Sequence, residues 1–242
     1  MSRFYVPRES VRGGVITISG KEAHHIIDVM RLKRLDKVVT FDGTGREYVG
    51  FVKEMKLKSL TVEIVETRTP AGASHSRITL IQAIPKKEKM DYLVEKATEL
   101  GACAVLPVLT ARTIPAWDDS KKARHVERWR AIAKEASKQC GRADIPNVDD
   151  IKRLSDVLKD PTDYDLLLIA ALSDEAISLK DALAGFKGGK IAVAIGPEGD
   201  FTAEEIGAAR ETGFKVISLG ARVLKSDTAG LAVLSILNYE FQ

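Results

Sequence analysis

Residues 190–231 read KIAVAIGPEGDFTAEEIGAARETGFKVISLGARVLKSDTAGL and contain two short apolar runs that each stop at a glycine-bearing break. The first run, 191–195, ends in GPEGD at 196–200, and the second, 216–219, ends in GAR at 220–222. Apolar runs that stop at glycine before a helical pattern are typical of strands that open into loops. Because ligands bind beyond the carboxyl ends of parallel strands, the two loops predict a ligand pocket.

Together with the sequence on either side of it, this stretch predicts an α/β domain. Strands that are apolar throughout alternate with amphipathic helices, a pattern typical of a mainly parallel sheet. Further strands are expected at 78–84, 105–109 and 165–171, and helices at 87–100, about 119–139 and 179–186. Thr202 and Glu205 form a capping-box pattern that should start a helix. Ser226 or Asp227 should cap a final helix at 228–239.

The first 70 residues predict a smaller, β-rich domain. Strands are expected at 15–18, 37–41, 47–53 and 59–65, with one short helix at 21–30. The segment 69–74 reads TPAGAS, a break in composition that indicates a domain boundary. We therefore expect one domain at 1–70 and a second at 75–242.

Composition excludes several classes of protein. The chain has 242 residues, of which 45% are hydrophobic and 29% charged, so it can bury a core. Its longest apolar run, 166–172, is too short to cross a bilayer, and residues 1–10 lack the apolar core of a signal peptide. We expect a cytoplasmic protein. Cys103 and Cys140 have no metal-ligand spacing, so neither a metal site nor a disulfide scaffold is expected.

Basic residues are concentrated in the N-terminal third. Residues 1–70 carry 13 Lys and Arg against 9 Asp and Glu, although the whole chain has a net charge of only +3. A local cluster consists of Arg31, Lys33, Arg34 and Lys37. Such a patch can bind phosphates, but a solvated charged surface explains the charge equally well.

The glycine loops match neither common nucleotide-binding motif. GxGxxG and GxxxxGK[ST] are both absent, and GPEG alone could be a structural turn. The ordered composite is more specific. GPEGD, a helix and LGARVLKSDTAG closely resemble the GPEGG…LGxRxLRxET region of RsmE-type enzymes, which are small-subunit ribosomal RNA methyltransferases of the SPOUT superfamily.

The resemblance extends over almost the whole chain. Residues 20–50 are similar to the family's N-terminal PUA-like β-barrel, and residues 87–101 to the first helix of its catalytic domain. Residues 129–142, which end in QCGR, are similar to its long helix. The sequence departs from the family pattern at Asp200, where glycine is usual, at Ala221, where proline is common, and in SDTAG, which replaces TETA.

The resemblance implies an S-adenosyl-L-methionine-dependent enzyme of rRNA processing and ribosome biogenesis that methylates N3 of a uridine in 16S rRNA. It also implies a homodimer and a C-terminal trefoil knot. General topology rules disfavour knots, so the knot rests on the resemblance alone. Two alternatives remain open: a SPOUT methyltransferase that acts on another RNA such as tRNA, and a non-catalytic, RNA-binding ribosome-assembly protein.

Methylation of uridine N3 requires removal of the N3 proton or stabilisation of the resulting anion. Arg222 is our candidate for stabilising the anion, with a surface ion pair as the alternative. Glu198 or Asp227 is the candidate base, although Asp227 could instead cap a helix. N3 methylation needs no covalent adduct, so Cys140 is expected to pack or to line the pocket rather than to react.

The resemblance also implies binding residues for cofactor and RNA. The cofactor set is Leu172, Ile195, Gly196, Gly199, Leu219, Gly220, Leu224, Lys225 and Thr228, in which any apolar member could be plain core. The RNA set is His25, Arg31, Lys33, Arg34, Gln139 and Arg142. His24 and His25 lack further ligands at metal spacing, so RNA contact or packing is the preferred interpretation of His25.

Overall fold

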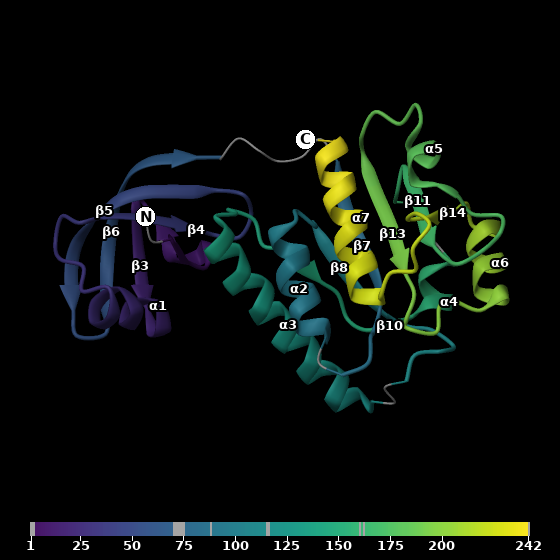
Figure 1. The fold of residues 1–242 in the computed structure, drawn as a ribbon. Helices are drawn as coiled ribbons and strands as arrows, with labels where there is room; N and C mark the ends of the chain where they lie inside the picture. Colours follow the sequence, from purple (N-terminus) through teal and green to yellow (C-terminus); the bar gives the residue numbers. More distant parts are fainter. Residues whose placement is uncertain are drawn as a thin grey trace. The chain divides into compact units, whose positions relative to one another are not determined.

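The computed structural model describes residues 3–69, 76–87, 89–114, 117–159, 161 and 163–241. The chain divides into two compact units (Figure 1). The first comprises Met1–Gly72 and Lys134–Ile145, and the second comprises Ala73–Ala133 and Pro146–Gln242. The expected boundary at 70–75 lies outside the described residues.

The first unit is built on a six-stranded sheet. Its strands lie in the order β1-β4-β5-β6-β3-β2, and all neighbours are antiparallel except β1 and β4. The strands are β1 (Arg3–Tyr5), β2 (Val11–Arg12), β3 (Val15–Ser19), β4 (Lys37–Phe41), β5 (Glu47–Lys56) and β6 (Ser59–Arg68). The helix expected at 21–30 is a short α-helix, α1 (Gly20–His24), followed by a π-helical turn, η2 (His25–Val29). A 3₁₀ turn, η1 (Arg8–Ser10), follows β1.

A segment distant in sequence completes the first unit. The helix α3 (Asp119–Cys140) contributes its residues from Lys134 onward to this unit. Lys138 Nζ donates to Glu22 Oε1 at 2.8 Å, and both side chains are largely buried. Burial alone would lower the pKa of Lys138, but its hydrogen bond to Glu22 raises it above the usual value. The domain boundary predicted from the sequence places this segment in the second domain, at 75–242, instead.

The second unit contains one parallel sheet. Its strands lie in the order β10-β8-β7-β13-β11-β14-β12, with β9 beside β8. Every pairing is parallel, which confirms the α/β class predicted from the fully apolar strands. The strands are β7 (Arg77–Ala83), β8 (Ala104–Leu109), β9 (Asn147–Val148), β10 (Lys152–Arg153), β11 (Leu166–Ala170), β12 (Ile177–Ser178), β13 (Lys190–Ile195) and β14 (Lys215–Ser218).

Helices cover this sheet and enclose its core. The C-terminal helix α7 packs against α2, β7 and β13, and Figure 1 shows α2 and α7 side by side. The helices are α2 (Lys89–Glu99), the first part of α3, α4 (Leu154–Val157), α5 (Leu179–Leu183), α6 (Ala203–Glu211) and α7 (Ser226–Glu240). None of the described helices is long and apolar enough to cross a membrane.

The two predicted helix starts have different outcomes. The capping box is confirmed, because Thr202 and Glu205 exchange side-chain and backbone hydrogen bonds at the start of α6. The predicted cap of the last helix is wrong: α7 begins at Ser226 itself, after Lys225, without a side-chain cap. The Ser226 hydroxyl instead accepts a hydrogen bond from Gln82 Nε2 and donates one to the carbonyl oxygen of Gly196, so both of its hydrogen bonds go to residues outside the helix. The trefoil knot stays a prediction.

Candidate active site

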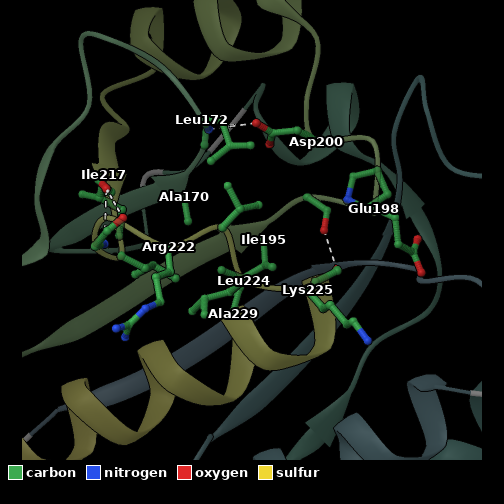
Figure 2. Close-up of a pocket in the computed structure, with 18 residues that line it drawn as sticks. Ala170, Leu172, Ile195, Glu198, Asp200, Ile217, Arg222, Leu224, Lys225 and Ala229 are labelled. Carbon is green, nitrogen blue, oxygen red and sulfur yellow. Dashed lines mark hydrogen bonds between the residues drawn. The ribbon is translucent and has the colours of Figure 1, made fainter.

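A pocket of about 270 Å³ lies where β11, β13 and β14 end (Figure 2). Two loops supply most of its lining. We call residues 196–201, after β13, the proline loop, and residues 219–225, after β14, the arginine loop. The lining residues are Ala170, Ala171, Leu172, Ile195, Gly196, Pro197, Glu198, Asp200, Ile217, Ser218, Leu219, Gly220, Arg222, Val223, Leu224, Lys225, Ser226 and Ala229.

Most of the predicted cofactor set lies in this lining. Leu172, Ile195, Gly196, Leu219, Gly220, Leu224 and Lys225 contribute to it, as do the catalytic candidates Arg222 and Glu198. Gly199, Thr228 and Asp227 are not among the lining residues. Thr228 is exposed on α7, and the Gly199 carbonyl accepts a hydrogen bond from Arg112 Nη1 on the far side of the loop. The roles of all these residues stay predictions.

A buried polar network fixes the floor of the pocket. Gln82 on β7 is completely buried, and its Nε2 donates to Ser226 Oγ at 2.9 Å and to the Ala83 carbonyl at 2.9 Å. Ser226 Oγ donates in turn to the Gly196 carbonyl. A Cβ at Gly230 would lie 2.8 Å from Gln82 Oε1, so glycine allows α7 to approach β7. The network thereby joins the first turn of α7 to the end of β13.

Asp200 joins the loops after β11 and β13. Its Oδ2 accepts a hydrogen bond from the Leu172 amide at 2.8 Å, and its Oδ1 accepts from the Phe201 amide at 2.8 Å. Its backbone is left-handed, with φ of 60°. That conformation costs an L-residue roughly 1 kcal/mol, which two hydrogen bonds worth about 1 kcal/mol each can offset. Asp200 does not cap α6, because Thr202 is the N-cap of that helix.

Arg112 supports the proline loop from outside the pocket. Its Nη1 donates to the carbonyls of Gly199 at 2.5 Å and Phe201 at 3.2 Å. The neighbouring Ala111 amide donates to Glu205 Oε1 at 2.8 Å. The loop after β8 is therefore fixed to the proline loop and to the start of α6. Sequence reasoning missed Arg112, since its partners are backbone carbonyls that carry no residue signal.

Lys89 lies between the two candidate bases. Its Nζ is 3.0 Å from Asp227 Oδ1 and 3.9 Å from Glu198 Oε1. Glu198 also accepts a hydrogen bond from the Lys86 amide at 3.1 Å. All three charged side chains are half-buried, with exposed fractions of 32% for Lys89, 25% for Glu198 and 22% for Asp227. Lys89 is a second residue that sequence reasoning missed, although it opens the helix α2 at the KEKMD segment.

The six residues predicted to bind RNA all belong to the first unit. Arg31, Lys33, Arg34 and Gln139 are exposed, whereas His25 is half-buried with its ring edge-to-face on Phe4. Arg142 forms an ion pair with Asp144. Exposed apolar side chains accompany the basic ones in this part of the chain. They are Val29, Met30 and Leu35.

His24 and Cys140 have side chains of the kinds that can bind metals or act as nucleophiles, and the structure shows their surroundings. His24 Nδ1 lies 2.6 Å from Asp28 Oδ2. The described residues contain no group of three or more His, Cys, Asp and Glu side chains placed to hold a metal ion. The expectation that Cys140 packs or lines the pocket is wrong: it is an exposed free thiol in the first unit and is not among the residues that line the pocket.

These features define an α/β protein with a small-molecule pocket at the ends of parallel strands. A family model described as an RNA methyltransferase domain matches residues 73–238, and one described as an RNA methyltransferase PUA domain matches residues 18–65. The chain is 30% identical to ribosomal RNA small subunit methyltransferase E of Mycobacterium bovis, over 96% of this chain and 88% of that protein.

Two solved structures extend the comparison to three dimensions. Ribosomal RNA small subunit methyltransferase E of Neisseria gonorrhoeae, bound to S-adenosylmethionine, has a TM-score of 0.88 and 30% identity, covering 100% of this chain and 98% of that one. A methyltransferase of Legionella pneumophila in complex with the same cofactor has a TM-score of 0.86 and 30% identity, covering 98% and 97%. The chain therefore belongs to the RNA methyltransferase family of ribosomal RNA small subunit methyltransferase E.

Proposed function

We propose that this protein transfers a methyl group from S-adenosyl-L-methionine to N3 of a uridine in the 16S rRNA of the small ribosomal subunit. The observation that carries the proposal is the pocket at the ends of β11, β13 and β14, lined by the two loops that resemble the family's cofactor motif. The related Neisseria gonorrhoeae enzyme was solved with S-adenosylmethionine bound.

The pocket residues fit this cofactor. Leu172, Val223 and Leu224 give the lining apolar surface for a purine ring, and the first two are 67% and 73% exposed. Within the described part of the chain, no protein group is hydrogen-bonded to the backbone of Leu219 or of residues 221–224. These amides and carbonyls can therefore pair with the polar edge of adenine. Carboxylates at Glu198 and Asp200 complement a positively charged ligand.

The chain's own residues have to position the uridine and manage its N3 proton. When bound, S-adenosylmethionine supplies an electrophilic methyl group on a sulfonium. Glu198 lines the pocket and is the better-placed candidate to accept the N3 proton, while Asp227 lies outside the lining and pairs with Lys89. Lys89 keeps the two carboxylates together. Arg222, exposed in the arginine loop, supplies the positive charge that stabilises the uridine anion.

The first unit supplies the contact to RNA. Arg31, Lys33 and Arg34 present exposed cations to phosphates, and Gln139 lies exposed on the segment that completes this unit. His25 and Arg142 complete the proposed set. Binding through phosphate contacts should weaken steeply with salt. Because N3 normally takes part in base pairing, the target uridine has to be unpaired or flipped out of its helix.

The organisation of the protein is part of the proposal. We infer a PUA-like domain at 1–70 that residues 134–145 complete, a SPOUT methyltransferase domain in the rest of 75–242, a cytoplasmic location and a homodimer. The C-terminal helix α7 exposes Ile236 at 43% and Tyr239 at 80%, which supports an interface there. Light scattering of the wild-type protein and of an Ile236→Glu, Tyr239→Glu variant tests the dimer. A wild-type mass equal to one chain would contradict it.

Mass-spectrometric mapping of rRNA tests the proposed reaction. Cells without the protein should lack one N3-methyluridine in 16S rRNA, and purified protein with S-adenosylmethionine should restore it on small subunits. Methylation that appears in tRNA instead would favour the alternative substrate. Loss of subunit assembly with an unchanged modification pattern would favour a non-catalytic assembly role.

A further inference from the structure

The two carboxylates that line the pocket have different partners. Glu198 accepts a hydrogen bond from the Lys86 amide and lies 3.9 Å from the ammonium of Lys89. Within the described part of the chain, the hydrogen bonds that Asp200 accepts come from the backbone amides of Leu172 and Phe201. Among the described residues, no lysine, arginine or histidine forms an ion pair with Asp200. Asp200 therefore brings to the pocket a negative charge that no ion pair of the described residues neutralises.

The position of this charge is fixed by the backbone. One oxygen is held by the loop after β11 and the other by its own loop, as Figure 2 shows for Leu172. A Cβ at Gly196 would lie 3.1 Å from Asp200 Oδ1, so the carboxylate fits closely against the end of β13. Each oxygen accepts one amide hydrogen and keeps a second lone pair, so the carboxylate can still interact with a bound cation.

We propose that Asp200 is a specificity residue that makes the pocket prefer S-adenosylmethionine over S-adenosylhomocysteine. The proposal rests on the proposed function. When uridine N3 forms its bond to the methyl carbon, the C–S bond breaks, its electron pair stays on sulfur, and the N3 proton passes to the base. The ligand thereby changes from a positively charged sulfonium to a neutral thioether. A carboxylate without an ion-pair partner in the same pocket attracts the positively charged sulfonium but has no such attraction for the neutral thioether.

The preference has a consequence for turnover. A pocket that binds donor and product equally is inhibited as product accumulates, whereas a fixed negative charge weakens the hold on the ligand as soon as the methyl group leaves. The family pattern GPEGG has glycine at this position, so the preference is a property of this chain's own sequence. It also explains why a left-handed position holds an aspartate rather than glycine.

Calorimetric titration with S-adenosylmethionine, S-adenosylhomocysteine and sinefungin tests the proposal. Sinefungin has an amine-bearing carbon in place of the methylated sulfur; the amine is positively charged, so sinefungin should behave like the charged donor. In Asp200→Asn, the dissociation constant for S-adenosylmethionine should rise by about 5-fold relative to that for S-adenosylhomocysteine. The reason is that the amide keeps the size of the side chain but removes its charge. Asp200→Gly should lose the same preference, and it should fold because its φ of 60° suits glycine.

Asp174→Asn is the matched control. Asp174 lies exposed in the loop after β11 and does not line the pocket, so its loss removes the same charge without changing the ratio. An equal loss of affinity for all three ligands in Asp200→Asn and Asp200→Gly would overturn the proposal, because Asp200 would then act only by holding the loops. Wild-type protein that binds none of the three would refute the proposed function itself, a separate result.

Discussion

The proline loop and the arginine loop line the same pocket but are held very differently. The proline loop is tied to four other parts of the second unit: Ser226 of α7, the Lys86 amide, Arg112, and the Leu172 amide through Asp200. In the arginine loop before Lys225, the described hydrogen bonds are only the two between Ser218 and Gly220. Val223 at its tip is 73% exposed.

The difference indicates a division of labour. A loop fixed from several sides is preorganised, so it loses little entropy when a ligand binds. A loop with exposed apolar side chains and unpaired backbone groups becomes ordered by the ligand, at some cost in affinity. We expect the proline loop to behave as a rigid wall and the arginine loop to close on the cofactor, bringing Arg222 to the reacting base.

Arg222→Ala gives the largest expected effect and tests the arginine loop. Turnover on small subunits should fall roughly 100-fold, because one charge that stabilises the anion is lost. The dissociation constant for S-adenosylmethionine should stay within about twofold, since Arg222 acts on the uridine. Single-turnover methylation and calorimetry measure the two quantities. Arg222→Lys, which keeps the charge, should recover part of the rate, and undiminished turnover in the alanine variant would remove the proposed role.

Ser226→Ala tests the rigid wall through its floor. The change deprives the Gly196 carbonyl of its donor and the Gln82 amide of an acceptor, and both lie in a buried setting. The free energy of unfolding should fall by about 1–3 kcal/mol. Urea unfolding measures it. Ser226→Thr keeps the hydroxyl and should cost less, so equal losses in the two variants would show that the hydrogen bonds are not the cause.

Arg112→Ala tests the wall from outside the pocket. The Arg112 guanidinium bonds the carbonyls of Gly199 and Phe201 and is not among the residues that line the pocket, so its removal should loosen the proline loop without deleting a cofactor contact. The dissociation constant for S-adenosylmethionine should rise roughly tenfold, from the added cost of ordering the loop. Arg130→Ala is the control, because Arg130 bonds Val148 and Asp150 instead. Unchanged affinity in Arg112→Ala would mean that the loop is rigid without it.

Val223→Ser should have the smallest effect on stability. Its side chain is mostly exposed and its backbone is not hydrogen-bonded to protein groups in the described part of the chain. The free energy of unfolding without ligand should change by less than about 0.5 kcal/mol. Thermal unfolding with and without S-adenosylmethionine measures this, and the variant should gain less from the ligand than wild type does. A large loss without ligand would show that the arginine loop is already packed.

Local sequence patterns correctly predicted the structural features that depend on residues close together in the sequence. The strand ends, the capping box at Thr202 and the glycine breaks all follow from such patterns, and they located most of the pocket lining. The start of α7 could not be predicted in the same way, because Ser226 bonds Gln82, 144 residues away, and Gly196, 30 residues away.

Contacts between residues that are far apart in the sequence, and that belong to no recognisable motif, could not be predicted from the sequence. Lys89 and Asp227 are 138 residues apart, and nothing in either segment distinguishes their pair from solvated charges. The end of α3 belongs to the first unit because of contacts such as Lys138 with Glu22, 116 residues apart. A single boundary predicted from composition divides the chain into two continuous segments. It therefore cannot assign a later segment, such as the end of α3, to the first unit.

Hydrogen–deuterium exchange with and without S-adenosylmethionine tests the division between the two loops most directly. Peptides spanning residues 196–201 should exchange slowly in the free protein and change little when the cofactor binds. Peptides spanning residues 219–225 should exchange fast in the free protein and become strongly protected. Equal protection of both loops in the free protein, or protection gained mainly in residues 196–201, would contradict this division.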